Sequence, residues 1–162
     1  MPDINDLNKE ITTIAEEITK IKKDMQEKIS NIINNIFSYL PDDISAISWY
    51  QYTPYFNDGD PCVNSIGEVY VISGDITREH INKISENPYI IEEMEYDDYE
   101  DDEDETGLSK LTVLNYDDEV GNSVVKFIHS IKDELENIYG TNTCIILSRE
   151  FGVTVEQFDC GY

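Results

Sequence analysis

Residues 4–39 read INDLNKEITTIAEEITKIKKDMQEKISNIINNIFSY, and this stretch carries the strongest periodic signal of the 162-residue chain. An apolar residue recurs at every seventh position, and a second apolar series follows three residues after the first. The first three heptads and the start of the fourth carry this seam at Ile4, Leu7, Ile11, Ile14, Ile18, Ile21 and Met25. The spacing predicts an N-terminal amphipathic helix within residues 1–40, capped by Asp3 and ended by Pro41.

The predicted helix has two different halves. Its second apolar series fails at Lys28 and Asn35, where the apolar face widens, so we expect the last turns to pack on a globular core. A helix of this length extends about 50 Å, more than a domain of this size needs for its own packing. We therefore expect self-association through the first three heptads, as a homodimer. A hairpin folded back within the same chain is the alternative.

Residues 41–162 contain several strand signals. Aromatic and β-favouring residues fill 44–56, and a second strand is predicted at about 68–72. Two apolar, β-branched runs at 143–147 and 153–158 have the spacing of a hairpin. Because the predicted strands are mostly adjacent in sequence, they favour an antiparallel sheet of about four strands.

Helical signals lie between these strands. A short helix is predicted after Gly74 and stops at Asn87, which precedes a proline. An apolar stripe from Val124 to Ile138 predicts a second helix, closed by Gly140. The fold class that follows is α+β, with a long N-terminal helix and an antiparallel sheet packed against helices on one side.

The chain is strongly acidic. It has 35 Asp and Glu against 11 Lys and Arg, a formal net charge of −24 at pH 7. Residues 1–40 hold 7 acidic and 5 basic residues, whereas residues 41–162 hold 28 acidic and 6 basic residues. Such a charge excludes direct binding to nucleic acid or to an anionic membrane surface. No apolar run reaches a membrane span of about 18–20 residues and the first residues do not resemble a signal peptide, so a cytoplasmic protein is expected.

Sequence motifs of enzymes and metal sites are missing. The chain lacks a phosphate-binding loop, a dinucleotide fingerprint, a zincin motif and a nucleophile elbow. Cys62, Cys144 and Cys160 show no C-x-x-C spacing, and we expect reduced thiols with Cys144 in the core. The acidic stretch 57–61 lacks the glutamate of an EF-hand loop, so a turn is predicted there. We predict a non-enzymatic protein without metal or cofactor; the alternative is an enzyme that uses a buried carboxylate.

The densest charge lies in an insertion over residues 92–106, EEMEYDDYEDDEDET, in which 11 of 15 residues are acidic and none is basic. Side chains on one face of an extended segment recur every roughly 6.6–6.8 Å. A row of carboxylates at this spacing can imitate a row of phosphates. Tyrosines in the tract can stack on arginine side chains of a partner. The predicted partner-binding residues are Glu92, Glu93, Glu95, Tyr96, Asp97, Asp98, Tyr99, Glu100, Asp101, Asp102, Glu103, Asp104 and Glu105.

This acidity predicts the kind of partner. A strongly negative surface accelerates docking to strongly basic surfaces, and basic grooves chiefly hold nucleic acid. The predicted partner is therefore a basic nucleic-acid-binding protein such as a host nuclease or effector, which the chain would bind by mimicking DNA or RNA charge. The alternative is a coiled-coil adaptor or structural protein whose acidity, including a solvated loop at 92–106, serves only solubility.

Residues 49–62, WYQYTPYFNDGDPC, resemble a W-x-Q-Y-T-P-Y-F-N-D-G-D-x-C stretch that follows a long helix in a group of small bacteriophage proteins. Residues 151–156, FGVTVE, are similar to the end of those proteins. The resemblance implies a phage protein in the host cytoplasm, and analogy with DNA-mimic antirestriction and anti-CRISPR inhibitors adds the expectation of an inhibitory role. It implies no site residues. The residues themselves predict aromatics packed on a helix, a turn at Asp58–Gly59, and Cys62 filling a small gap.

Overall fold

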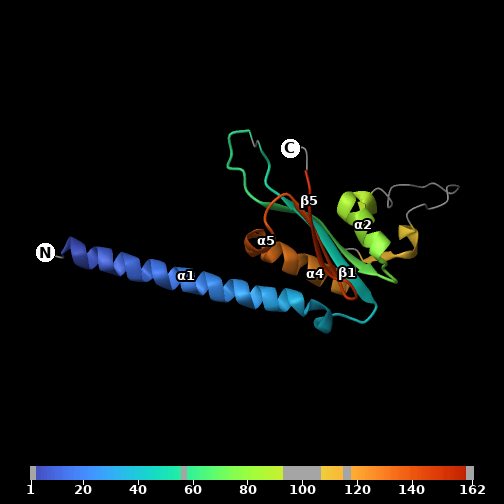
Figure 1. The fold of residues 1–162 in the computed structure, drawn as a ribbon, viewed down its shortest axis with the longest axis horizontal. Helices are drawn as coiled ribbons and strands as arrows, with labels where there is room; N and C mark the ends of the chain where they lie inside the picture. The colour runs from blue at the N-terminus through green and yellow to red at the C-terminus, as the bar shows by residue number, and fades with distance from the viewer. Residues whose placement is uncertain (1–2, 56–57, 93–106, 115–117, 160–162) are drawn as a thin grey trace. The chain divides into compact units, whose positions relative to one another are not determined.

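A computed structural model describes residues 3–55, 58–92, 107–114 and 118–159. The chain divides into two compact units, residues 1–36 and 37–162. It contains a long N-terminal helix and a five-stranded antiparallel sheet packed with helices, so the predicted α+β class is confirmed (Figure 1). Among the residues so described, no helix is both long and apolar enough to cross a bilayer.

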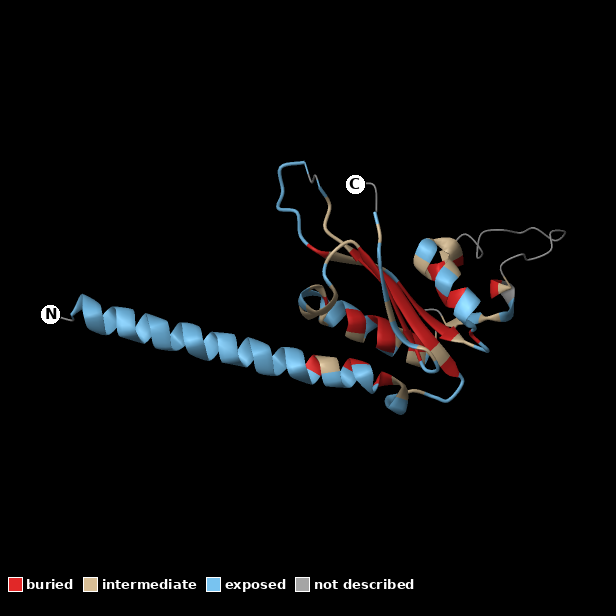
Figure 2. Cartoon of the chain, in the orientation of Figure 1, coloured by how far each residue is buried: buried red, intermediate tan, exposed pale blue. Residues whose placement is uncertain are grey.

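Helix α1 (Ile4–Asn34) forms the first unit almost by itself. Asp3 is its N-cap, as predicted, and the Asp3 carboxylate accepts a hydrogen bond from the Asn5 backbone N–H at 3.1 Å. Every residue from 3 to 28 is exposed, whereas Ile29 and Ile33 are buried (Figure 2). The α-helix ends at Asn34 and not at Pro41 as predicted, and a short 3₁₀ helix, η1 (Ile36–Tyr39), follows in the chain.

The second unit is built on a sheet with strand order β3-β2-β1-β4-β5, in which all neighbouring strands are antiparallel. The predicted hairpin near the C-terminus is confirmed as β4 and β5. A fifth strand, the three-residue β3, was not predicted, because so short an edge strand shows no alternation of its own. The strand bounds are β1 (Ile44–Tyr52), β2 (Ser65–Ser73), β3 (Thr112–Leu114), β4 (Thr143–Ser148) and β5 (Gly152–Gln157).

Helices cover both faces of this sheet, not one face as predicted. Seven of the nine residues of β1 are buried, as in strands that are covered on both sides. Ala46 shares a core cluster with Ile81 and Ile84 of α2 (Arg78–Glu86). On the opposite face, the Trp49 ring meets the edge of Tyr139 at a centroid distance of 6.1 Å. Tyr139 belongs to α5 (Lys132–Tyr139), and Figure 1 shows α5 and α2 on opposite sides of the sheet.

The single helix predicted from Val124 to Ile138 is in fact two helices, α4 (Glu119–Ser130) and α5. The backbone leaves helical geometry at Ile131, whose N–H bonds the Ile128 carbonyl in a tighter turn. The Ser130 hydroxyl also donates to the Phe127 carbonyl at 2.7 Å, a local bond that competes with regular helix. A second 3₁₀ helix is η2 (Leu108–Lys110), and residues 90–92 are also helical.

Candidate partner-binding surfaces

The predicted acidic tract meets the described structure at one residue, Glu92. The other predicted tract residues, 93–105, lie outside the described residues. Glu92 is half-buried, and its carboxylate accepts a hydrogen bond from the Tyr70 hydroxyl at 2.8 Å. Tyr70 is buried in the core cluster beneath α2, so this bond attaches the start of the tract to β2. Burial, reinforced by the Glu92 hydrogen bond and charge, raises the pKa of Tyr70 far above its ordinary value.

The acidic side chains outside the tract lie on the surface wherever the structure describes them. Within the described part of residues 41–162 there are 17 Asp and Glu, of which none is buried and 13 are exposed. The same part holds 6 Lys and Arg. Glu79 pairs with Lys83 at 3.1 Å across one turn of α2. The sheet domain therefore presents a large excess of negative charge to solvent even without the tract.

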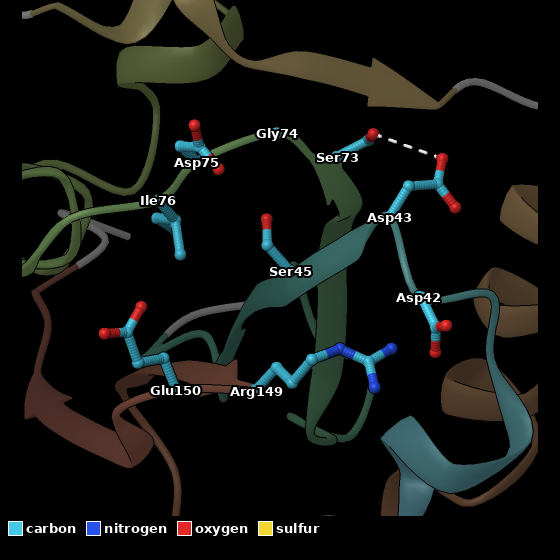
Figure 3. Close-up of a pocket in the computed structure, with 9 residues that line it drawn as sticks. All are labelled: Asp42, Asp43, Ser45, Ser73, Gly74, Asp75, Ile76, Arg149 and Glu150. Carbon is cyan, nitrogen blue, oxygen red and sulfur yellow. Dashed lines mark hydrogen bonds between the residues drawn. The ribbon is translucent and has the colours of Figure 1, made fainter.

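One pocket of about 490 Å³ gathers several of these acids (Figure 3). Asp42 and Asp43 lie at one end of it, and Asp75 and Glu150 lie at the other. The antiparallel register brings these segments together, because Ile44 pairs with Ser73 and Ala46 pairs with Ser148. The remaining lining residues are Ser45, Ser73, Gly74, Ile76 and Arg149.

Arg149 has a structural role beside this pocket. Its guanidinium donates from Nε to the Ile44 carbonyl and from Nη2 to the Pro41 carbonyl, both at 2.9 Å, and from Nη1 to the Phe37 carbonyl at 3.2 Å. It also lies 5.1 Å from the Phe37 ring centroid. These bonds fix the chain that leads into β1. Sequence reasoning did not find the pocket, because its residues come from three distant segments.

The polar side chains that line the pocket are carboxylates, two serine hydroxyls and one guanidinium. Its lining residues include neither histidine nor cysteine. Within the ranges given above, no three Asp, Glu, His or Cys side chains are grouped so that they could hold a metal ion. The Ser73 hydroxyl donates to the Asp43 carboxylate at 3.4 Å. What the arrangement offers chemically is a set of carboxylate acceptors open to solvent, suited to a cationic side chain.

The second predicted surface is the apolar seam of α1, defined as Ile4, Leu7, Ile11, Ile14, Ile18, Ile21 and Met25. All seven residues are exposed, from 41% at Met25 to 67% at Ile4. Their spacing places them along one face of the helix. Large apolar side chains this exposed and this contiguous indicate an interaction surface.

The aromatic stretch that carries the phage-protein resemblance follows its predicted packing only in part. Trp49 is fully buried against Tyr139 of α5, as expected, whereas Tyr55 is exposed. Asp58 and Gly59 both have positive φ, which confirms the turn. Cys62, by contrast, is exposed, so the prediction that it fills a gap is wrong. It follows this turn in a loop outside the sheet, whereas a gap-filling role requires a place in the core.

Cys144 behaves as predicted for a core thiol. It lies in β4, is fully buried, and belongs to the core cluster beneath α2. Burial raises the pKa of the Cys144 thiol from 9.0 to about 12. The thiolate is therefore scarce at neutral pH, which argues against a nucleophilic role for this cysteine.

Tyr50 gives the sheet domain a testable alkaline transition. Burial, with a smaller contribution from the Glu92 charge, raises the pKa of Tyr50 from 10.0 to about 12. The folded state therefore holds this proton more tightly than the unfolded state, and the resulting stability is present below pH 10 and lost as the pH rises toward 12. We expect the free energy of unfolding of Tyr50→Phe to fall less than that of the wild type across this window.

Urea unfolding followed by circular dichroism at several alkaline pH values measures this difference. The matched control is Tyr55→Phe, because Tyr55 is 73% exposed and both variants remove one phenol while the acidic background stays the same. Parallel loss of stability in Tyr50→Phe and wild type would contradict the assignment.

No protein-family model, curated protein or solved structure matches this chain. The resemblance of residues 49–62 to bacteriophage proteins therefore stays a prediction, and the functional argument depends on the two surfaces described above.

Proposed function

We propose that the protein is a non-enzymatic, phage-type inhibitor that binds the basic nucleic-acid groove of a host defence nuclease, or of another nucleic-acid-binding protein, by mimicking DNA or RNA charge. One observation carries this proposal: residues 41–162 hold 28 acidic and 6 basic residues, and every acidic side chain in their described part lies outside the core. Repulsion among these charges opposes folding. A strongly basic partner would offset that repulsion, and binding to it would explain why the chain carries so many acidic residues.

The acidic pocket supports the same proposal. Its carboxylates, Asp42 and Asp43 at one end and Asp75 and Glu150 at the other, are exposed acceptors that lie within two residues of a strand end. Arginine side chains that hold phosphates also bind carboxylates in a bidentate manner. A groove lined by lysine and arginine would therefore meet fixed acceptors here and further acids in the tract at 92–106.

The test begins with capture of partners from a host lysate at low salt and their identification after elution at high salt. For a partner so found, we expect the affinity to fall at least about tenfold between about 50 mM and about 500 mM salt, because contacts of this kind are ionic. Added duplex DNA or guide RNA should compete with the protein for that partner. Equal affinity at both salt concentrations, measured by calorimetry, would contradict the proposal.

A pair of charge variants locates the binding surface within that experiment. Asp97→Asn, Asp98→Asn and Asp101→Asn together remove three charges from the tract and should lower the association rate. Asp6→Asn, Glu16→Gln and Glu27→Gln together remove three exposed charges from α1 and serve as the control. Equal effects of the two variants would assign binding to net charge instead of to the tract.

The second candidate function is a coiled-coil adaptor or structural protein whose acidity only keeps it soluble. The observation that favours it is the exposed apolar seam of α1. In that case Ile11→Asp with Ile18→Asp should abolish partner binding, while deletion of residues 92–106 should change it little. If the protein is a nucleic-acid mimic, deletion of residues 92–106 should weaken binding to the same partner more than the two substitutions in α1 do.

A further inference from the structure

The apolar side chains of the α1 seam are exposed, and we expect another protein surface to cover them. All 25 helical residues from 4 to 28 are exposed, including the seven apolar side chains of the seam. Helices in water draw most of their stability from packing an apolar face, and nucleation makes an isolated helix marginal. Residues 3–28 are without such packing within the described chain. Their regular helix therefore implies a surface that covers the seam.

Charges beside the seam identify the occupant as another copy of the same helix, running parallel. With Ile4, Ile11 and Ile18 at heptad position a, position g is acidic at Glu10, Glu17 and Asp24. An antiparallel pair would place these acids opposite one another. In a parallel pair, Glu17 of one copy faces position e of the next heptad, which is Lys22 of the other copy. The other two acids, Glu10 and Asp24, face the uncharged Ala15 and Ile29. The parallel direction therefore avoids the repulsion of an antiparallel pair and adds one ion pair.

The branched residues in the seam determine the number of copies. Isoleucine stands at position a in Ile11 and Ile18 and at position d in Ile14 and Ile21. Isoleucine at both positions favours three or four strands over two. Positions e and g are mostly polar or charged, which leaves an apolar stripe too narrow for a four-stranded core. We infer that the seam of α1 assembles three copies of this chain into a parallel coiled coil, in place of the homodimer expected from the heptad spacing alone.

The parallel arrangement has a consequence for charge. Because the acidic domain follows α1 in the sequence, three parallel helices bring three such domains to the same end of the coiled coil. Each chain carries a net charge of −24, so their mutual repulsion opposes assembly. Salt screens this repulsion and should strengthen the trimer, whereas salt should weaken the ionic partner binding proposed above. The trimer does not depend on that proposed function.

Sedimentation equilibrium of the full chain tests the inference directly. The expected mass is three times 18.7 kDa, with a larger trimer fraction at high salt than at low salt. Ile14→Asp with Ile18→Asp should give a monomer that has also lost helical circular dichroism. Thr12→Asp with Thr19→Asp adds the same two charges on the outer face of α1 and should remain trimeric.

The outcomes separate the parts of the inference. A monomeric wild type, or variant pairs that behave alike, would overturn self-association, and a dimer or tetramer would overturn the three-stranded assignment. Fluorescence of Trp49, the single and fully buried tryptophan, reports whether the sheet domain of each variant has folded. Leu7→Cys, in a Cys62→Ser and Cys160→Ser background, tests direction. Ready disulfide formation between copies supports parallel helices, and its absence would overturn them.

Discussion

Gln51→Leu is expected to lower the free energy of unfolding of the sheet domain by about 2–5 kcal/mol, because it leaves the buried Trp49 indole N–H without its acceptor and removes two bonds to backbone carbonyls. Gln51 is fully buried in β1. Its side-chain carbonyl accepts from the Trp49 indole N–H at 3.1 Å, and its amide donates to the backbone carbonyls of Leu135, at 3.1 Å, and Gly140. Leucine fills a similar volume but replaces none of these bonds. Urea unfolding followed by far-ultraviolet circular dichroism measures the change.

A double-mutant cycle with Trp49→Phe separates the indole bond from general core packing. Trp49→Phe removes the donor while Gln51 keeps its bonds to α5 and the residue that follows it. The losses of unfolding free energy in the two single variants should therefore sum to more than the loss in the double variant, because each single substitution removes the same indole hydrogen bond. A Gln51→Leu variant as stable as the wild type would show that this buried network contributes nothing.

Gln51 also shows where sequence reasoning stops. Two elements were predicted from local patterns. Heptad spacing indicates α1, and two strand runs joined by a short turn indicate the β4–β5 hairpin. A glutamine among aromatics in a strand is ordinarily a solvent-facing residue. Its burial depends on carbonyls of Leu135 and Gly140, which lie 84 and 89 residues away. No local pattern contains that information.

The same reason explains the error about helix placement. The alternation of β1 is masked because residues of both faces are buried, so the sequence looks like one aromatic run and not like two covered faces. Helix α2 packs on the Ala46 face, and α5 packs on the Trp49 face. Tertiary contacts decide which helix packs on which face, so the sequence predicted helical segments but placed them all on one side of the sheet.

The two candidate surfaces differ in how far sequence predicts them. The seam of α1 is a periodic pattern in one helix, so the sequence specifies both its residues and their shared face. The acidic pocket depends on the register that pairs Ile44 with Ser73 and Ala46 with Ser148. Composition alone predicts that acids are abundant. It cannot predict that Asp42, Asp75 and Glu150 meet around one hollow.

Gly67→Ala is expected to destabilise the sheet domain by about 3 kcal/mol through overpacking. Gly67 lies in β2 beneath the ring of Tyr50, and an added Cβ would overlap ring atoms Cε2 and Cζ and lie 2.6 Å from the hydroxyl oxygen. The ring has little room to move, because Tyr89 and Phe158 pack against it at centroid distances of 5.1 and 5.3 Å. Urea unfolding measures the loss.

The control for Gly67→Ala is the same substitution in a Tyr50→Ala background. Removal of the ring opens the space that the new methyl group needs, so Gly67→Ala should cost almost nothing there, although Tyr50→Ala is itself destabilising. Backbone strain predicts a different result, since a cost from the β2 backbone would be the same with or without the ring. Equal losses in the two backgrounds would therefore show that the β2 backbone conformation, and not contact with the Tyr50 ring, requires glycine at position 67.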